Sequence, residues 1–207
     1  MTRKIKVLIV DDHAIVRMGL CSVLGTKKDI AVVGSAEDGT SAIAKVAKLH
    51  PDVVLMDIVM PEMDGAKATA EIIRIAPTTR ILILTSFGTA DGIAHALKSG
   101  AAGALMKNVD CSELVDAIRA AVRGERVVAP EIEKMLLESP PVPELTERQK
   151  EILISMSRGL TDADIALQLQ LTPYSVREHI TTIFNKIGAA NKTEAVAIAL
   201  RKHLLKI

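Results

Sequence analysis

Short hydrophobic runs alternate with amphipathic stretches over the first 124 residues of the chain. The runs that predict strands are Ile5–Val10, Ile30–Ser35, Val53–Asp57, Ile81–Thr85 and Gly103–Met106. The stretches that predict helices are His13–Leu24, Gly39–Leu49, Ala66–Ile75, Thr89–Lys98 and Cys111–Arg123. Strict alternation of strand and helix is typical of a parallel sheet covered on both faces, and right-handed crossovers make such a domain doubly wound. The sequence therefore predicts an α/β domain with a doubly wound, five-stranded parallel sheet over residues 1–125.

The alternation stops after Gly124. Arg126–Ser139 reads as a short helix, and Ser139–Pro143 holds three prolines in five residues. Such a segment cannot continue a helix and favours an extended, semi-rigid connector, so we assign residues 126–143 to a linker. A proline-rich tract can also be an SH3-type ligand, but this one stands alone.

Only helices are expected in residues 144–207. The predicted helices are Glu147–Arg158, Asp162–Leu169, Tyr174–Ile187 and one from Thr193 to about Leu204. Thr146 with Gln149 forms a capping box, and Thr172 before Pro173 is an N-cap followed by proline at the first helical position. The short turn Gln170–Thr172 has helix-turn-helix spacing, which would direct the N-terminus of the third helix into a DNA major groove. We therefore expect a small all-α domain of four helices with a helix-turn-helix.

Composition narrows the class of protein. Hydrophobic residues make up 49% of the chain and charged residues 25%, which suits packed cores and argues against disorder. The net charge of +1 means that any DNA binding must come from a local face, and 1% aromatic residues leave almost nothing for stacking on single-stranded bases. Cys21 and Cys111 have no metal-ligand neighbours and are predicted to be reduced core thiols of a cytoplasmic protein. Because no stretch approaches 18 apolar residues, neither secretion nor a membrane partner is expected.

Acidic residues stand at the ends of two predicted strands. Asp11 and Asp12 follow the first strand, and Asp57 ends the third. Neighbouring parallel strands end at the same edge of a sheet, so three carboxylates should converge there, which is costly unless a hard cation such as Mg²⁺ lies among them. An alternative is that these residues simply cap the helices that follow them.

Two further strand ends add a hydroxyl and an ammonium group. Thr85 follows the fourth hydrophobic run and Lys107 the fifth. A nucleophilic carboxylate, a divalent cation, a hydroxyl donor and a lysine are what phosphoryl transfer onto an aspartate would use. Each residue alone also has a structural explanation. Threonine is common in strands, and lysine is common at the exposed end of a strand.

This set of residues resembles the receiver domain of two-component response regulators. The matching positions are Asp11-Asp12, Asp57 with Met60-Pro61 and Asp64-Gly65, Thr85-Ser86 and Lys107, with nearly all of residues 4–124 in register. The resemblance implies a flavodoxin-like fold and a sensor histidine kinase as phosphoryl donor. It implies that Asp57 is the phosphoacceptor. It also implies that Mg²⁺ is bound by Asp12, Asp57 and the backbone carbonyl of Val59, with Asp11 acting through water.

The resemblance further implies that Thr85 and Ser86 follow the phosphoryl group as a switch and that Lys107 pairs with it. One position departs from the pattern, because receivers usually carry an aromatic residue where this chain has Ala104. We hypothesise that Phe87 restricts access to Asp57 or fills part of the space at Ala104. An ordinary aromatic residue at a helix start explains Phe87 equally well.

The third C-terminal helix has one apolar and one polar face. Val176, Ile180, Ile183 and Ile187 form the apolar stripe. The residues that we predict to contact DNA are Thr172, Tyr174, Ser175, Arg177, Glu178, Thr181, Thr182, Asn185 and Lys186. Since residues 144–207 hold nine basic and seven acidic residues, a solvated face of a small bundle could show the same pattern.

Residues 145–205 resemble the LuxR-type DNA-binding domain. The resemblance lies in Leu145–Leu153, Gly159-Leu160, Asp164–Ala166, Ser175–His179, Lys186–Gly188 and Asn191–Ala195. Receiver and LuxR-type domain in this order are similar to the NarL/FixJ class of response regulators. The resemblance implies that Arg177 and His179 are recognition-helix positions and that the last helix is a dimer contact. A basic residue is common where Thr181 stands and Glu178 adds an acid, so an operator sequence cannot be borrowed from relatives.

We therefore expect a DNA-binding transcriptional response regulator, not an enzyme, that is switched by phosphorylation of Asp57. As an active homodimer it would bind two half-sites of double-stranded DNA about one turn apart. One alternative is a phosphorylation-independent DNA-binding regulator with an atypical receiver, motivated by Ala104. Another is a phosphate sink or interaction module whose helical domain only dimerises.

Overall fold

The computed structural model describes residues 3–86, 90–138, 145–201 and 204. The chain divides into two compact units, Met1–Pro141 and Val142–Ile207. Each unit has a hydrophobic core of its own, built almost entirely from aliphatic side chains. The predicted proline-rich connector, 139–143, lies outside the described residues.

A single parallel sheet forms the centre of the first unit. Its strands are β1 (Ile5–Val10), β2 (Ile30–Ala36), β3 (Val53–Asp57), β4 (Arg80–Thr85), β5 (Gly103–Met106) and β6 (Val127–Val128). Their order across the sheet is β2-β1-β3-β4-β5-β6, which reverses direction after β1 as a doubly wound sheet does. Every residue of β3 is buried, as expected for a central strand covered on both faces.

The sixth strand corrects the sequence-based assignment of this segment. Val127 pairs with Gly103 and Val128 with Ala104 in parallel, where we predicted only a helix over Arg126–Ser139. The helix α6 begins at Pro130 and ends at Glu138. A Cβ atom on Gly103 would lie 1.9 Å from the carbonyl oxygen of Val127, so the absent side chain lets the two strands approach. The sheet therefore has six strands, and two of its residues lie in the predicted linker.

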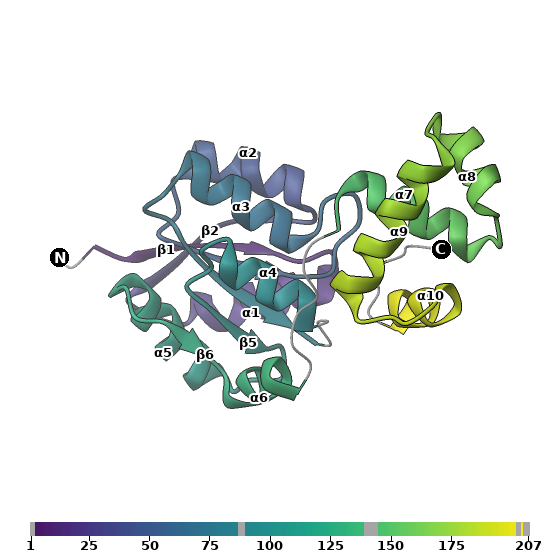
Figure 1. The fold of residues 1–207 in the computed structure, drawn as a ribbon. Helices are drawn as coiled ribbons and strands as arrows, with labels where there is room; N and C mark the ends of the chain where they lie inside the picture. The colour runs from purple at the N-terminus through teal and green to yellow at the C-terminus, as the bar shows by residue number, and fades with distance from the viewer. Residues whose placement is uncertain (1–2, 87–89, 139–144, 202–203, 205–207) are drawn as a thin grey trace. The chain divides into compact units, whose positions relative to one another are not determined.

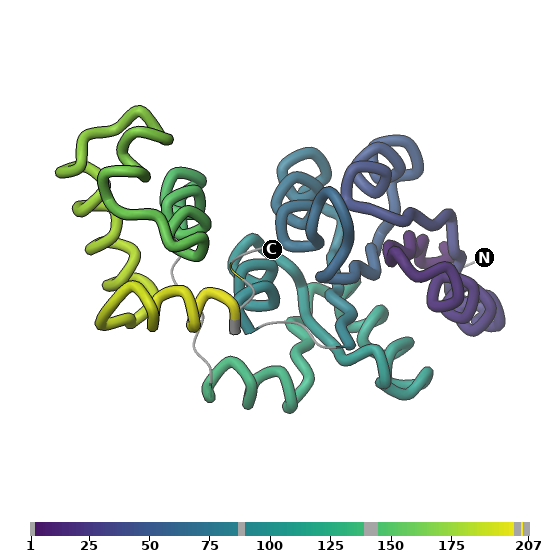
Figure 2. The backbone as a smooth tube through the Cα atoms, turned by 90° about the vertical axis from the view of Figure 1, so that its right-hand side faces the viewer, coloured from purple at the N-terminus to yellow at the C-terminus, as the bar shows by residue number. Residues whose placement is uncertain are grey.

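Helices cover both faces of the sheet (Figures 1 and 2). They are α1 (Ala14–Gly25), α2 (Gly39–Leu49), α3 (Gly65–Ile75), α4 (Ala90–Lys98) and α5 (Cys111–Val122). The helices α2, α3 and α4 pack side by side on one face, and α1 and α5 lie on the other. Ile132 of α6 is fully buried in the core of this unit, so α6 packs with the α/β fold.

The second unit consists, over its described residues, of α7 (Glu147–Ser157), α8 (Asp162–Leu169), α9 (Pro173–Ile187) and α10 (Lys192–Arg201). The capping box of Thr146 and Gln149 is confirmed, and Thr161 with Asp164 forms a second one. The side chain of Thr172 accepts a hydrogen bond from the backbone of Ser175, so α9 begins as predicted. The helix-turn-helix formed by α8 and α9 is therefore present.

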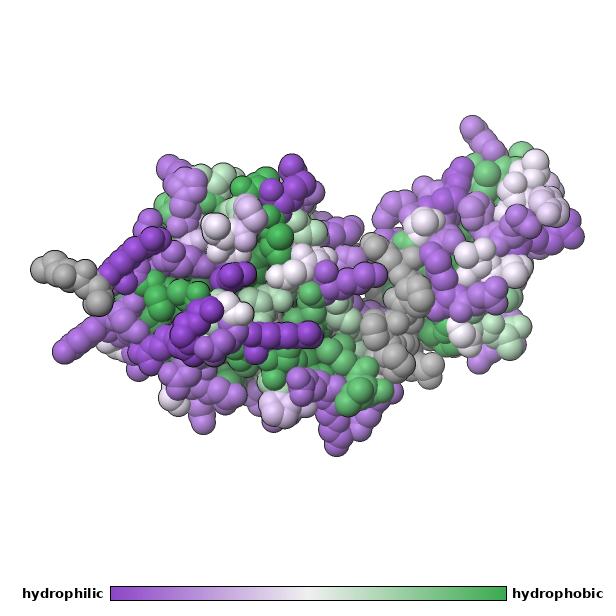
Figure 3. All heavy atoms as spheres, turned by 60° about the vertical axis from the view of Figure 1, so that its left-hand side comes forward, coloured by the Kyte–Doolittle hydropathy of each residue, from purple (hydrophilic) through white to green (hydrophobic). Residues whose placement is uncertain are grey.

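The prediction for the cysteines is right for one and wrong for the other. Cys21 is half-buried and packs against the core, whereas Cys111 is exposed at the first position of α5. The first buried residue of this helix is Leu114, three positions later. Hydrophilic and hydrophobic side chains are interspersed on the face drawn in Figure 3. No helix in the described part of the chain is long and apolar enough to cross a membrane.

Candidate functional site

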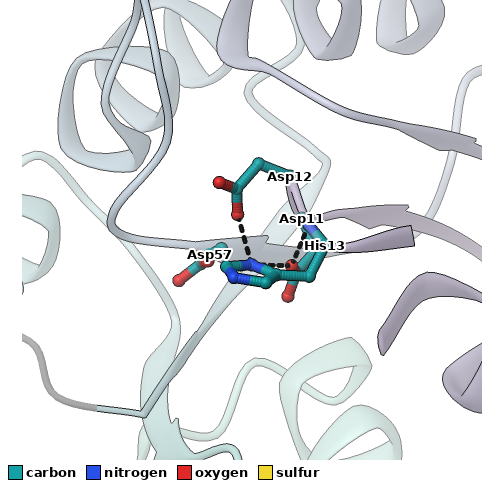
Figure 4. A group of neighbouring side chains, drawn as sticks. All are labelled: Asp11, Asp12, His13 and Asp57. Carbon is teal, nitrogen blue, oxygen red and sulfur yellow. Dashed lines mark hydrogen bonds and ion pairs between the residues drawn. The ribbon is translucent and has the colours of Figure 1, made fainter. Parts of the chain in front are cut away.

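The three predicted carboxylates meet at one end of the sheet. Val10 pairs with Met56, so the next residues, Asp11 and Asp57, leave neighbouring strands side by side. Their side chains are almost completely buried, whereas Asp12 is exposed. Ligand atoms of these acids and of His13 all lie within 4.8 Å of one another (Figure 4). We call Asp11, Asp12, Asp57 and the adjoining Lys107 the acidic pocket.

Lys107 supplies a positive charge to this pocket. Its Nζ lies 2.7 Å from Asp11 Oδ2 and 2.7 Å from Asp57 Oδ2. The backbone N–H of Lys107 donates to the carbonyl oxygen of Thr85 at 2.8 Å, which fixes the end of β5 against the end of β4. Two buried carboxylates would repel each other strongly, and the ammonium between them offsets that repulsion.

Burial and the contacts of Lys107 act in opposite directions on the pKa values of Asp57 and Lys107. Burial raises the pKa of Asp57, and the opposing effect of the hydrogen bond and charge of Lys107 does not cancel it. Burial alone would lower the pKa of Lys107, but its hydrogen bonds with Asp11 and Asp57 raise it overall. The pocket therefore holds a firmly protonated lysine and a carboxylate whose ionised form is disfavoured, which is the situation a divalent cation would relieve.

Asp57→Asn is expected to stabilise the metal-free protein at neutral pH. A carboxyl group whose pKa is higher in the folded than in the unfolded state binds more protons when folded, so the free energy of unfolding falls as the pH rises through and above the ordinary aspartate pKa. The asparagine variant lacks this loss and should be more stable by about 1–2 kcal/mol at pH 7. The difference should vanish toward pH 3.

Urea unfolding followed by circular dichroism, in EDTA over a pH series, measures this difference. Added Mg²⁺ should narrow it, because a cation that binds the folded wild type stabilises that protein alone. A difference that stays constant with pH would contradict an origin in the ionisation of Asp57.

The alternative that Asp57 caps the following helix does not fit the geometry. The N-cap of α3 is Asp64, whose side chain accepts a hydrogen bond from the backbone N–H of Lys67 at 2.8 Å. Asp57 Oδ1 instead accepts from the backbone N–H of Val59 at 3.4 Å, and its other oxygen faces Lys107. Asp57 is thus directed into the pocket.

Sequence reasoning missed two residues at the start of α1. His13 Nδ1 lies 2.6 Å from Asp12 Oδ1, and the backbone N–H of His13 donates to Asp11 Oδ1 at 2.9 Å (Figure 4). The guanidinium of Arg17 donates to the backbone carbonyl of Asp11 at 2.6 Å. The only signal in the sequence was the position of His13 directly after the two acids.

The pocket suits a hard divalent cation. Its carboxylate oxygens are the ligands that Mg²⁺ prefers, and Asp11 and Asp57 are nearly buried side by side, which calls for compensating positive charge. Val59, whose carbonyl oxygen is the remaining predicted ligand, is exposed two residues beyond Asp57. The donor set therefore fits Mg²⁺, which receiver domains bind.

The remaining predicted receiver residues lie around the same edge of the sheet. Thr85 is buried at the end of β4, where it pairs with Met106, and Ser86 is exposed. Ala104 is fully buried between Ile83 and Val128 in the sheet. Phe87 lies outside the described residues, so the hypothesis about its role stays a prediction.

The second candidate site is the outward face of α9. Its apolar stripe, Val176, Ile180, Ile183 and Ile187, is buried as predicted. The exposed residues of the predicted DNA-contact set are Thr172, Tyr174, Arg177, Glu178, Thr181, Thr182 and Asn185, whereas Ser175 and His179 are half-buried. Lys186 lies apart from this face, because its Nζ donates to the side-chain oxygen of Gln149 on α7 at 2.9 Å.

Comparisons with known proteins agree with both sites. Residues 7–119 match the family model "Response regulator receiver domain", and residues 143–199 match "Bacterial regulatory proteins, luxR family". The response regulator protein VraR of Staphylococcus aureus is 37% identical over 207 residues, covering 98% of this chain and 99% of its own.

Two solved structures extend the comparison. The crystal structure of the response regulator ChrA from a heme-sensing two-component system is 35% identical, covers 99% of this chain and 100% of its own, and has a TM-score of 0.59. RcsB of Salmonella typhimurium is 24% identical, covers 97% of this chain and 100% of its own, and has a TM-score of 0.62. At this level of identity the comparison shows a shared fold alone. The chain therefore belongs to the two-component response regulators, with a receiver domain followed by a LuxR-type, helix-turn-helix DNA-binding domain of the kind that regulates transcription.

Proposed function

We propose that phosphorylation of Asp57 by a sensor histidine kinase switches this regulator between two states of DNA binding. The observation that carries the proposal is the position of Lys107, whose Nζ lies 2.7 Å from both Asp11 and Asp57. Because this ammonium already contacts an oxygen of Asp57, it can pair with a phosphoryl group formed there, and a bound divalent cation would offset the remaining negative charge of the carboxylates.

The chemistry is a transfer of a phosphoryl group between two protein side chains. A carboxylate oxygen of Asp57 attacks the phosphorus of a phosphohistidine on the kinase, an oxygen–phosphorus bond forms and the nitrogen–phosphorus bond breaks. When bound, Mg²⁺ neutralises charge on the phosphoryl oxygens. Lys107 would exchange its contact with Asp57 for one with a phosphoryl oxygen, and the hydroxyl of Thr85 could donate to another.

The new charge would change the receiver beyond the pocket. Thr85 and Lys107 are joined through the backbone at the ends of β4 and β5, so a shift of either residue displaces both strand ends. Ala104 leaves no aromatic side chain at the position where receivers usually carry one, and the displacement would reach α4 and α5 through the aliphatic core. The protein would act in the cytoplasm. Its active form would be a homodimer bound to two half-sites of double-stranded DNA.

Selection from a pool of random DNA duplexes tests the switch. The samples are the wild type with and without a small-molecule phosphodonor and Mg²⁺, and Asp57→Ala with the donor, all at one stated salt concentration. We expect only the phosphorylated wild type to enrich one sequence. Phosphoryl incorporation, followed by phosphate-affinity electrophoresis, should be absent in Asp57→Ala.

Ala104 supports a second candidate, a DNA-binding regulator that does not depend on phosphorylation. It predicts that all three samples enrich the same sequence to the same extent. A regulator that only sequesters phosphate predicts phosphorylation of Asp57 with no sequence enriched in any sample.

A further inference from the structure

The exposed face of α9 is concave and polar. Tyr174, Arg177, Glu178, Thr181 and Thr182 line a shallow hollow of about 430 Å³ on this helix. Their spacing of three and four residues places them on one side of the helix, opposite the buried stripe. This side is therefore the part of the C-terminal unit that can enter a DNA groove.

Glu178 is the acidic residue among the five that line this hollow. A carboxylate near DNA is repelled by the phosphates, so it favours binding only if a base compensates it. In the major groove, the amino groups of cytosine and adenine are the hydrogen-bond donors. Adenine presents the acceptor N7 beside its amino group, which repels a carboxylate, whereas the amino group of cytosine has no such acceptor next to it on its own base. Cytosine is thus the base that Glu178 accepts best.

The neighbouring hydroxyl groups are already engaged within the helix. Thr181 Oγ1 donates to the carbonyl oxygen of Arg177 at 3.0 Å, and Thr182 Oγ1 donates to that of Glu178 at 2.9 Å. Their hydrogen atoms are therefore directed away from the groove. The charged groups of Arg177 and Glu178 remain as the strongest polar groups in the middle of the face.

Tyr174 lies one helical turn before Glu178 on the same side of α9 and is 67% exposed. The interaction of its hydroxyl with the Glu178 carboxylate raises the pKa of Tyr174. The carboxylate of Glu178 and the hydroxyl of Tyr174 are therefore neighbouring polar groups on the exposed face.

We propose that Glu178 determines operator specificity by accepting a hydrogen bond from the amino group of a cytosine in the major groove of each half-site. The inference rests on the proposed DNA binding of the phosphorylated protein and adds the identity of one base. It predicts that the operator carries a C·G pair at one fixed position in each half-site. Replacing that cytosine should weaken binding of the wild type by about 10-fold.

The test compares sequence selection by four phosphorylated full-length proteins: wild type, Glu178→Gln, Glu178→Ala and Glu151→Gln. Glutamine pairs with adenine N6 and N7, so Glu178→Gln should change the enriched base at that position from cytosine to adenine. Glu178→Ala should leave the position without preference. Glu151 lies on α7 outside the hollow, so Glu151→Gln makes the same charge change and should alter affinity for all sequences alike.

The outcomes separate the inference from the function on which it rests. If the wild type enriches a sequence, but the cytosine is absent or is retained by both Glu178 variants, the inference is wrong and the proposed DNA binding stands. If no sequence is enriched by any phosphorylated protein, both are wrong. Because Glu178 is exposed, its variants should unfold at the wild-type temperature, which circular dichroism checks.

Discussion

Lys107→Ala is expected to slow phosphorylation of Asp57 by a small-molecule donor by about 100-fold, the loss typical of removing one charged group that stabilises a transition state. Lys107 Nζ lies 2.7 Å from each buried carboxylate, so alanine leaves Asp11 and Asp57 without their nearest positive charge. The pKa of Asp57, already raised by burial, should rise further. The nucleophile would be ionised less often, and the incoming phosphoryl group would meet no ammonium.

Binding of Mg²⁺ should change in the opposite direction. The ammonium and the cation both associate with the same carboxylates, so Lys107→Ala should bind Mg²⁺ more tightly, as measured by titration calorimetry. Lys48→Ala, at an exposed position in the last turn of α2, is the control and should leave both quantities unchanged. Weaker Mg²⁺ binding together with normal phosphorylation would show that Lys107 only holds the fold.

The acidic pocket was predictable because it follows from strand direction. The hydrophobic runs before Asp11, Asp57 and Lys107 have the length and composition of buried parallel strands, and parallel strands end at one edge. No such rule placed His13 or Arg17, since their contacts with the acids depend on the path of the loop between β1 and α1. The sequence therefore predicts which charges meet and not how the loop holds them.

The elements that were predicted wrongly are short or lie at a boundary. Two residues cannot show a strand period, and β6 exists because Val127 and Val128 meet an edge strand that carries Gly103. Cys111 stands at the first position of a helix, where the apolar residues around it in the sequence did not reveal that it is exposed.

On α9 the buried stripe was predictable from spacing, whereas the contact of Lys186 with Gln149 depends on where α7 packs.

A methyl group at residue 65 is expected to destabilise the first unit by about 3 kcal/mol or more, because the atoms in its way are backbone. A Cβ atom on Gly65 would lie 2.0 Å from the carbonyl oxygen of Asp57 and 3.0 Å from the Cα of Ile58. The N–H of Gly65 donates to the carbonyl oxygen of Ile58 at 3.0 Å, so the start of α3 is held against the loop that follows Asp57. Gly65→Ala must move that loop, and phosphorylation of the protein that remains folded should slow as well.

Gly19→Ala is the matched control for this change, and the opposite sign is expected. Gly19 lies inside α1, and a Cβ atom there would meet nothing within 4 Å. Alanine loses less conformational entropy than glycine on entering a helix, so the variant should gain about 0.5–1 kcal/mol. Urea unfolding of the full-length proteins, followed by circular dichroism, measures both. Equal stability of Gly65→Ala and the wild type would mean that the segment after β3 yields easily, and the rigid placement of Asp57 against α3 would then have to be abandoned.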